Sequence, residues 1–164
     1  MEQLWAPWRM ELIEKGNPQT GCIFCDLPQQ TNDRENLILG RTQHTFAILN
    51  KFPYNNGHLM VIPRQHGADL VGLPDEVHRE LAEMLRVALR ILGKAYPADG
   101  YNLGMNLGKS AGAGIEGHLH WHIVPRWNGD TNFMPVLGKT KVMIEYLHDG
   151  WDKLRPLFDL EFSR

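Results

Sequence analysis

The chain has 164 residues, 43% of them hydrophobic, which is enough for one domain with a buried core. Its 17 basic and 19 acidic residues give a formal net charge of −2 without a block of like charges, which excludes the basic stripe of a protein that binds long nucleic acid. We find neither the roughly 18 apolar residues of a membrane span nor a signal peptide, so we expect a cytoplasmic protein with no membrane partner.

The N-terminal part of the sequence predicts a helical leader followed by a cysteine segment. Apolar residues recur over 5–15, and Gly16 and Pro18 then end the predicted helix. Cys22 and Cys25 follow as a Cys-x-x-Cys pair, which serves elsewhere as a redox dithiol, as half of a zinc site, or as two buried small side chains. The region lacks the βαβ pattern of a thioredoxin-like dithiol, which favours zinc.

Three short apolar segments predict strands in the next part of the chain. They cover residues 37–40, 45–50 and 58–63. Pro53 and the Asn-Asn-Gly sequence at 55–57 supply turn residues between the last two segments. We therefore expect the last two strands to form a hairpin.

A long amphipathic helix is predicted to start at Leu73-Pro74-Asp75 and to stop near Pro97, because proline and acidic residues favour a helix start. Its apolar stripe consists of Val77, Leu81, Leu85, Ala88 and Leu92. Strands are predicted at 101–107 and 118–126, and the tail over 139–158 has helical spacing. Together these elements predict an α+β fold with an antiparallel sheet of about five strands, a long helix and a C-terminal helix.

The sequence His-Leu-His-Trp-His at 118–122 has a period of two. In an extended strand this period places His118, His120 and His122 on one face, about 6.5 Å apart. Imidazoles titrate near neutral pH and act as nucleophiles, proton donors or phosphate-binding cations. We expect His120, flanked by the other two, to be the nucleophile, and His122 to hold a proton near the scissile bridging oxygen. A zinc cluster is the alternative.

A glycine-rich segment connects the last two predicted strands. It is not a Walker motif, because Leu103 stands where the first glycine is required. Glycines such as Gly112 and Gly114 can still turn main-chain N–H groups toward an anion, and Lys109 or Ser110 can contact a phosphate chain. The alternative is a flexible connection without a ligand.

The histidine pattern resembles the signature of the histidine triad (HIT) superfamily of nucleotidyl hydrolases and transferases. The resemblance covers about residues 20–127 and includes the turn and strand at 57–63. Residues 4–10 and 125–136 are similar to a prokaryotic branch of the superfamily that is associated with diadenosine tetraphosphate phosphorylase. The resemblance implies a single HIT-like domain over 1–164, with a leader before its core and a helical tail after it.

The resemblance also implies a reaction. His120 is expected to form a nucleotidyl-enzyme from a dinucleoside polyphosphate, with diadenosine tetraphosphate as the expected substrate. Inorganic phosphate as acceptor then gives ADP and ATP, whereas water gives AMP and ATP. Cleavage of nucleoside phosphoramidates and non-catalytic nucleotide binding are the alternatives. A homodimer is implied as well, and no organic cofactor is expected.

By the same resemblance, four residues match the positions of a structural zinc site with a closed ligand shell: Cys22, Cys25, His66 and His118. Chelation of the metal is then expected to destabilise the protein.

Further family positions indicate where the substrate binds. Asn50 matches the residue that binds the ribose hydroxyls, although an asparagine here also caps turns. His58 matches a family position near the phosphates, or it only orients its neighbours. Asn106 lies directly before the glycine-rich segment, where it either orders that segment or contacts phosphate. Arg126 is either a phosphate-neutralising or a surface residue. The chain departs from the family pattern because residues 108–118 contain no glutamine, so the usual side-chain contact to phosphate is missing or replaced.

Overall fold

The computed structural model describes residues 21–130, 137 and 142–162, and the predicted leader at 5–15 lies outside them. Five strands form one antiparallel sheet in the order β1-β2-β3-β5-β4. The strands are β1 (Ile38–Arg41), β2 (Thr45–Leu49), β3 (Leu59–Pro63), β4 (Gly100–Gly104) and β5 (Trp121–Arg126). The α-helices are α2 (Ile23–Asp26), α3 (Asp75–Ala95) and α5 (Leu147–Phe162), and single 3-10 turns follow at η1 (Leu27–Gln29) and η2 (Lys109–Ala111). This is the α+β fold that the sequence predicts.

The β2–β3 hairpin forms the buried centre of the sheet, since every residue of both strands is buried. Its connecting turn is closed by main-chain hydrogen bonds from the N–H of Asn50 to the carbonyl of His58 and from the N–H of His58 to that of Asn55. Gly57 has φ +72°, in the left-handed region that favours glycine. The turn therefore places His58 at the start of β3, with its side chain fully buried.

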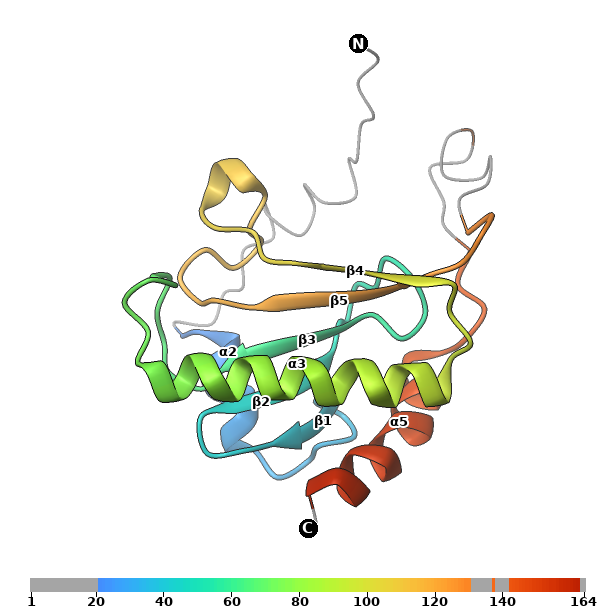
Figure 1. The fold of residues 1–164 in the computed structure, drawn as a ribbon, viewed down its shortest axis with the longest axis horizontal. Helices are drawn as coiled ribbons and strands as arrows, with labels where there is room; N and C mark the ends of the chain where they lie inside the picture. Colours follow the sequence, from blue (N-terminus) through green and yellow to red (C-terminus); the bar gives the residue numbers. More distant parts are fainter. Residues whose placement is uncertain (1–20, 131–136, 138–141, 163–164) are drawn as a thin grey trace.

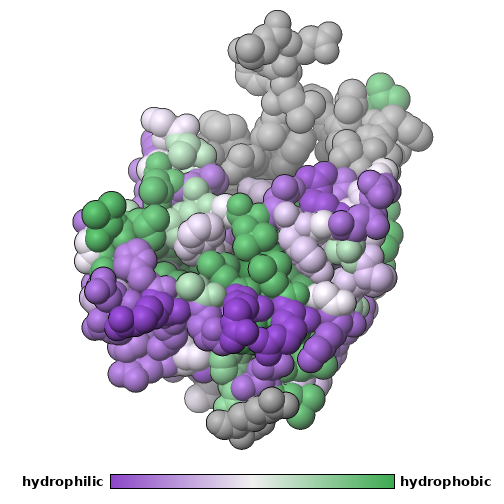
Figure 2. Space-filling model, in the orientation of Figure 1, coloured by the Kyte–Doolittle hydropathy of each residue, from purple (hydrophilic) through white to green (hydrophobic). Residues whose placement is uncertain are grey.

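Helix α3 lies across one face of the sheet (Figure 1). Asp75 and Glu76 occupy its first turn, where negative charge interacts favourably with the helix dipole. The predicted stripe is correct except at Leu85, which is only partly buried, whereas Met84 and Ile91 are buried. Figure 2 shows the polar outer surface of α3 next to an apolar surface over β4 and β5. Leu103 of β4 is exposed.

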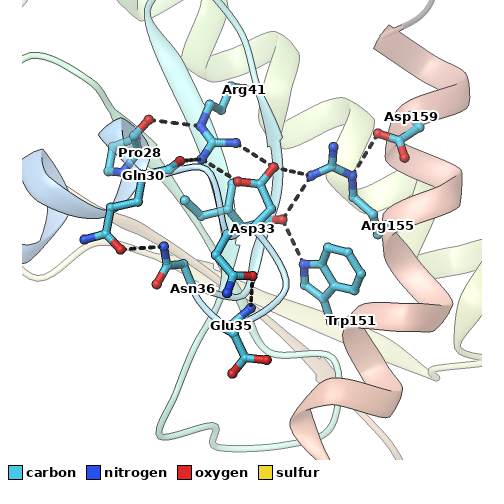
Figure 3. Close-up of polar contacts among 11 residues, drawn as sticks. Pro28, Gln30, Asp33, Glu35, Asn36, Arg41, Trp151, Arg155 and Asp159 are labelled. Carbon is cyan, nitrogen blue, oxygen red and sulfur yellow. Dashed lines mark hydrogen bonds and ion pairs between the residues drawn. The ribbon is translucent and has the colours of Figure 1, made fainter.

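Helix α5 packs against β1 and α3 through the buried side chains of Leu154 and Phe158. A polar network fixes it (Figure 3): the Arg155 guanidinium donates to Asp33, which also pairs with Arg41. The indole N–H of Trp151 donates to the main-chain carbonyl of Ile38 at 2.8 Å. The C-terminal helix is thus tied to the edge of the sheet opposite β4.

The predicted start of the C-terminal helix, near residue 139, is wrong. Helix α5 begins at Leu147, and the exposed residues Val142 and Ile144 lie before it. Residues 138–141 lie outside the described part of the chain. Strand β4 ends at Gly104, before the predicted residue 107. Among the described helices, none has an apolar stretch of the length a membrane span requires.

The prediction of a single strand over 118–126 is also wrong, because β5 begins at Trp121 and leaves His118 and His120 before it. The physical reason lies in the neighbouring strand. β3 pairs with β5 from Leu59 to Val61, but β3 ends at Pro63, which has no N–H to extend the ladder. The carbonyl of Pro63 instead accepts a hydrogen bond from the His118 ring at 2.7 Å.

Candidate active site and metal centre

Three imidazoles lie in a continuous row at the start of β3 and β5. The ring centroids of His120 and His122 are 5.1 Å apart, and those of His58 and His122 are also 5.1 Å apart. His118 lies before β5, and its ring packs on that of His66, with the ring centroids 5.3 Å apart. The structure therefore divides the three alternating histidines between two sites.

The hydrogen bonds of His58 determine the tautomer of His122. The main-chain N–H of Tyr54 donates to Nδ1 of His58 at 3.0 Å, so that nitrogen carries no proton. In the neutral ring the proton is then on Nε2, which lies 3.0 Å from Nδ1 of His122. Nδ1 of His122 accepts this bond, and a neutral His122 carries its own proton on Nε2.

The hydrogen bond of His120 leaves its other ring nitrogen with a lone pair. Nδ1 lies 2.8 Å from the main-chain carbonyl of His118, which can only accept, so Nδ1 carries the proton. Burial lowers the pKa of the His120 imidazole, which favours its neutral form. A buried neutral imidazole with an unprotonated Nε2 is a nucleophile.

A second cluster brings Cys22, Cys25, His66 and His118 together, with their ligand atoms all within 4.8 Å of one another. Nδ1 of His118 lies 3.3 Å from Cys22 Sγ and 3.6 Å from Cys25 Sγ, and Nδ1 of His66 lies 3.4 Å from Cys25 Sγ. Sulfur and nitrogen ligands of one tetrahedral zinc ion lie about 3.5 Å apart, since the bonds are about 2.3 and 2.05 Å long. These four residues could hold a metal ion.

The surroundings of the cluster agree with this geometry. Nε2 of His118 donates to the carbonyl of Pro63, which leaves the Nδ1 lone pair on the side of the cysteines. Burial and the neighbouring Cys22 raise the pKa of the Cys25 thiol to about 11. Without a cation, this site thus disfavours two thiolates at once, and bound metal would relieve that repulsion.

The two predicted substrate-binding asparagines both have hydrogen-bond partners within the chain. The Asn50 side-chain oxygen accepts the N–H of Phe52 at 2.9 Å, as in a turn cap, and its amide nitrogen lies 3.4 Å from Nε2 of His58. Asn106 donates to the carbonyl of Gly112 at 3.4 Å. Both roles inferred from the sequence, ribose and phosphate binding, stay predictions.

The glycine-rich segment forms the single turn η2, on which the side chains of Lys109 and Ser110 are exposed. Gly112 has φ +88° and its N–H donates to the carbonyl of Lys109 at 2.9 Å. Gly114 is exposed, with no atom within 4 Å of the position that a Cβ would occupy. The contacts of this segment with phosphate also stay predictions.

A cavity of about 320 Å³ opens beside His122, between β4, β5 and the β2–β3 turn. The polar residues that line it are Tyr54, Asn55, Asn102, Asn106, His122 and Arg126. Sequence reasoning assigned no substrate-binding role to Tyr54, Asn55 or Asn102. Only the pairing of β4 with β5 reveals Asn102, because it places Asn102 opposite Val124, on the face of the sheet that also carries His122.

Comparisons with known proteins agree with the geometry. The HIT domain family model matches residues 31–129. AP-4-A phosphorylase of Mycobacterium tuberculosis is 38% identical over 172 residues, which cover 100% of this chain and 86% of the relative. Adenosine 5'-monophosphoramidase HNT1 of Saccharomyces cerevisiae is 36% identical over 105 residues, covering 64% of this chain and 62% of the relative.

Solved structures show the same fold. A Zn-bound histidine triad family protein from Mycobacterium smegmatis superposes with a TM-score of 0.68 and 26% identity, covering 87% of this chain and 96% of that one. A histidine triad nucleotide-binding protein from Sulfolobus tokodaii gives the same TM-score at 29% identity, over 85% of this chain and 93% of its own. The chain belongs to the HIT domain family.

Proposed function

We propose that this HIT-family enzyme transfers a nucleotidyl group from diadenosine tetraphosphate to inorganic phosphate, giving ADP and ATP. The observation that carries the proposal is the pairing of an unprotonated Nε2 on His120 with a protonated Nε2 on the adjacent His122. The similarity over the full chain to AP-4-A phosphorylase supports this choice of substrate and acceptor.

In the first step, Nε2 of His120 attacks the phosphorus that carries the first adenosine. The bond from this phosphorus to the bridging oxygen breaks, and ATP leaves. The N–H of His122 donates a hydrogen bond to that oxygen, whose negative charge grows as the bond lengthens. The leaving oxygen becomes part of a terminal phosphate, an anion near neutral pH, so the hydrogen bond suffices without full proton transfer.

The intermediate is a nucleotidyl group bound to Nε2 of His120. The ring then carries positive charge, which the main-chain carbonyl of His118 stabilises by accepting the Nδ1 proton's hydrogen bond at 2.8 Å. In the second step an oxygen of inorganic phosphate attacks the phosphorus and the P–N bond breaks. ADP forms, and Nε2 regains its lone pair.

Other acceptors and leaving groups use the same intermediate. Water in place of phosphate gives AMP and ATP. An amine leaving group makes the reaction a phosphoramidase, as in the relative named adenosine 5'-monophosphoramidase. A non-catalytic nucleotide-binding protein differs from all of these because it binds nucleotide without turnover.

We propose a structural zinc ion held by Cys22, Cys25, His66 and His118, whose mutual distances and donor types fit tetrahedral coordination. All four positions are protein ligands, so the bound ion supplies folding energy and leaves no coordination position open to water. His118 links the two sites: its ring belongs to the metal cluster, and its carbonyl orients His120.

The remaining contacts of this proposal follow from the family resemblance. Asn50 binds the ribose, and the glycine-rich segment lies along the phosphates. Asn106 is proposed to contact phosphate because of its position directly before that segment. We propose a homodimer, because β4 is an edge strand with the exposed side chain of Leu103 and the surface over β4 and β5 is apolar (Figure 2). The cytoplasmic location expected from the sequence remains part of the proposal.

Product analysis tests the proposal directly. The purified chain is incubated with diadenosine tetraphosphate, with and without inorganic phosphate, and the nucleotides are separated. ADP and ATP that appear only with phosphate support a phosphorylase. AMP and ATP without phosphate indicate a hydrolase instead, and absence of products in both buffers refutes cleavage of this substrate.

A further inference from the structure

The cavity beside His122 extends along β5 and away from the nucleophile. His122, Val124 and Arg126 alternate along the strand, so their side chains share one face and are about 6.7 Å apart at each step. Asn102 of β4 pairs with Val124 and therefore lies midway between the two ends. All four residues line the cavity.

The charge of the lining indicates an anionic occupant. Among the described residues that line the cavity, Arg126 carries a permanent positive charge and none is a carboxylate. Within the cavity lining, Arg126 contacts the amide of Asn102, whose side-chain oxygen accepts a hydrogen bond from Nη1 of Arg126 at 2.8 Å. The Asn102 amide N–H₂ thus remains a donor for a ligand.

Asp130 holds Arg126 in place from outside the cavity. Nε and Nη2 of Arg126 donate to its two oxygens at 2.6 and 2.8 Å. Together with the bond to Asn102, these contacts use three of the five guanidinium N–H donors. Asp130 also accepts hydrogen bonds from the side-chain amide of Asn55 and from the main-chain N–H of Trp127, so its negative charge is shared among several donors. A guanidinium fixed in this way loses little side-chain entropy when it binds an anion.

We propose that this cavity binds the polyphosphate chain of the leaving group, and that Arg126 and Asn102 make the enzyme discriminate between substrates by the length of that chain. The inference rests on the proposed function, in which His122 faces the bridging oxygen. Successive phosphates beyond that oxygen extend along β5 toward Asn102 and then Arg126. A guanidinium is well suited to phosphate oxygens because its N–H donors are planar and paired.

The test uses the Arg126→Gln variant and compares two substrates that form the same nucleotidyl-histidine intermediate. Diadenosine tetraphosphate has a leaving group with three phosphates, whereas adenosine 5'-phosphoramidate releases ammonia, which carries no phosphate. The ratio of kcat/KM for the tetraphosphate to that for the phosphoramidate is expected to fall about 10- to 100-fold, the effect of one charge-assisted hydrogen bond. An unchanged ratio would overturn the proposal.

A second variant and a matched control separate this effect from general damage. Asn102→Asp keeps an acceptor for Arg126 but adds negative charge to the cavity, so the same ratio is expected to fall. Arg90→Gln is the control: Arg90 is also an exposed arginine in an ion pair, with Glu161, but lies on α3 and outside the cavity. An equal fall of the ratio in this control would contradict the proposal.

Calorimetric binding of inorganic triphosphate makes the test independent of turnover. The full wild-type chain is expected to bind triphosphate, and Arg126→Gln to bind it about 10- to 100-fold more weakly. Equal affinity of the two proteins, or no binding to either, overturns the assignment of the cavity. If the wild type binds triphosphate but does not cleave the tetraphosphate, the proposed function fails and the cavity remains an anion site.

Discussion

Replacement of Gly57 by alanine should destabilise the protein for two reasons, the backbone conformation at this position and the close packing around it. The backbone at this position has φ +72°, and a residue with a Cβ pays about 1–2 kcal/mol to adopt the left-handed region. The added methyl group would lie 2.9 Å from Tyr96 Cε2 and 3.3 Å from Leu92 Cδ2.

The neighbours have little freedom to move away. Leu92 is fully buried, and the Tyr96 hydroxyl donates to Glu145 at 2.5 Å. Overpacking of this kind costs typically about 1–3 kcal/mol, so we expect Gly57→Ala to lower the free energy of unfolding by about 2–5 kcal/mol. At about 2–4 °C per kcal/mol for a chain of this size, the melting temperature falls by about 4–20 °C.

Urea denaturation of Gly57→Ala and of Gly100→Ala measures the effect. A Cβ at Gly100 meets no atom within 4 Å, so this control should change stability by less than about 0.5 kcal/mol. Equal stability of the two variants would refute the reasoning. Since Gly57 precedes His58, the variant should also lose activity when the turn shifts, because the 3.0 Å bond from His58 to His122 depends on it.

The other predictions concern the nucleophile, the metal and the pH dependence of stability. His120→Ala should lower the turnover of every substrate by at least about a thousandfold while the circular dichroism spectrum stays native, and substantial residual turnover would exclude His120 as nucleophile. Metal analysis should find about one zinc per chain, and chelation or Cys22→Ala should lower the melting temperature; a folded, stable, metal-free preparation would contradict the site. Partial burial raises the pKa of the Asp33 carboxyl, but hydrogen bonds from Arg41 and Arg155 outweigh it and hold that pKa below its ordinary value. The associated stability is therefore present above the unfolded pKa of about 3.9 and is lost as the pH falls through the lower folded pKa. Asp33→Asn should lower stability at pH 7 and flatten this acid dependence in thermal melts, and an acid limb as steep as that of the wild type would disprove the role of the ion pairs.

Several parts of the fold and site follow from the sequence because they depend on local chemistry. Proline and acidic residues before an apolar stripe predict α3, which starts at Asp75 as expected. The turn residues between β2 and β3 predict their hairpin, and the structure confirms it. The family resemblance also names the four members of the cysteine and histidine cluster, and the structure brings them together.

Other features depend on contacts that no local pattern encodes. The period of two could not show that β5 starts at Trp121, because the end of its ladder depends on Pro63 in a strand distant along the chain. The same holds for α5, whose position is set by packing on β1 and by the ion pair of Arg155 with Asp33.

The alternating histidines, as residue types at fixed spacing, predicted phosphate chemistry with a zinc cluster as the alternative. The tertiary structure decided which nitrogen of each ring carries the proton, since the N–H of Tyr54 and the carbonyl of His118 act as donor and acceptor. It also placed Asn102 and Arg126 in one cavity. A side chain's composition is a property of the sequence, whereas its hydrogen-bond partners and its electrostatic surroundings exist only once distant segments have packed together.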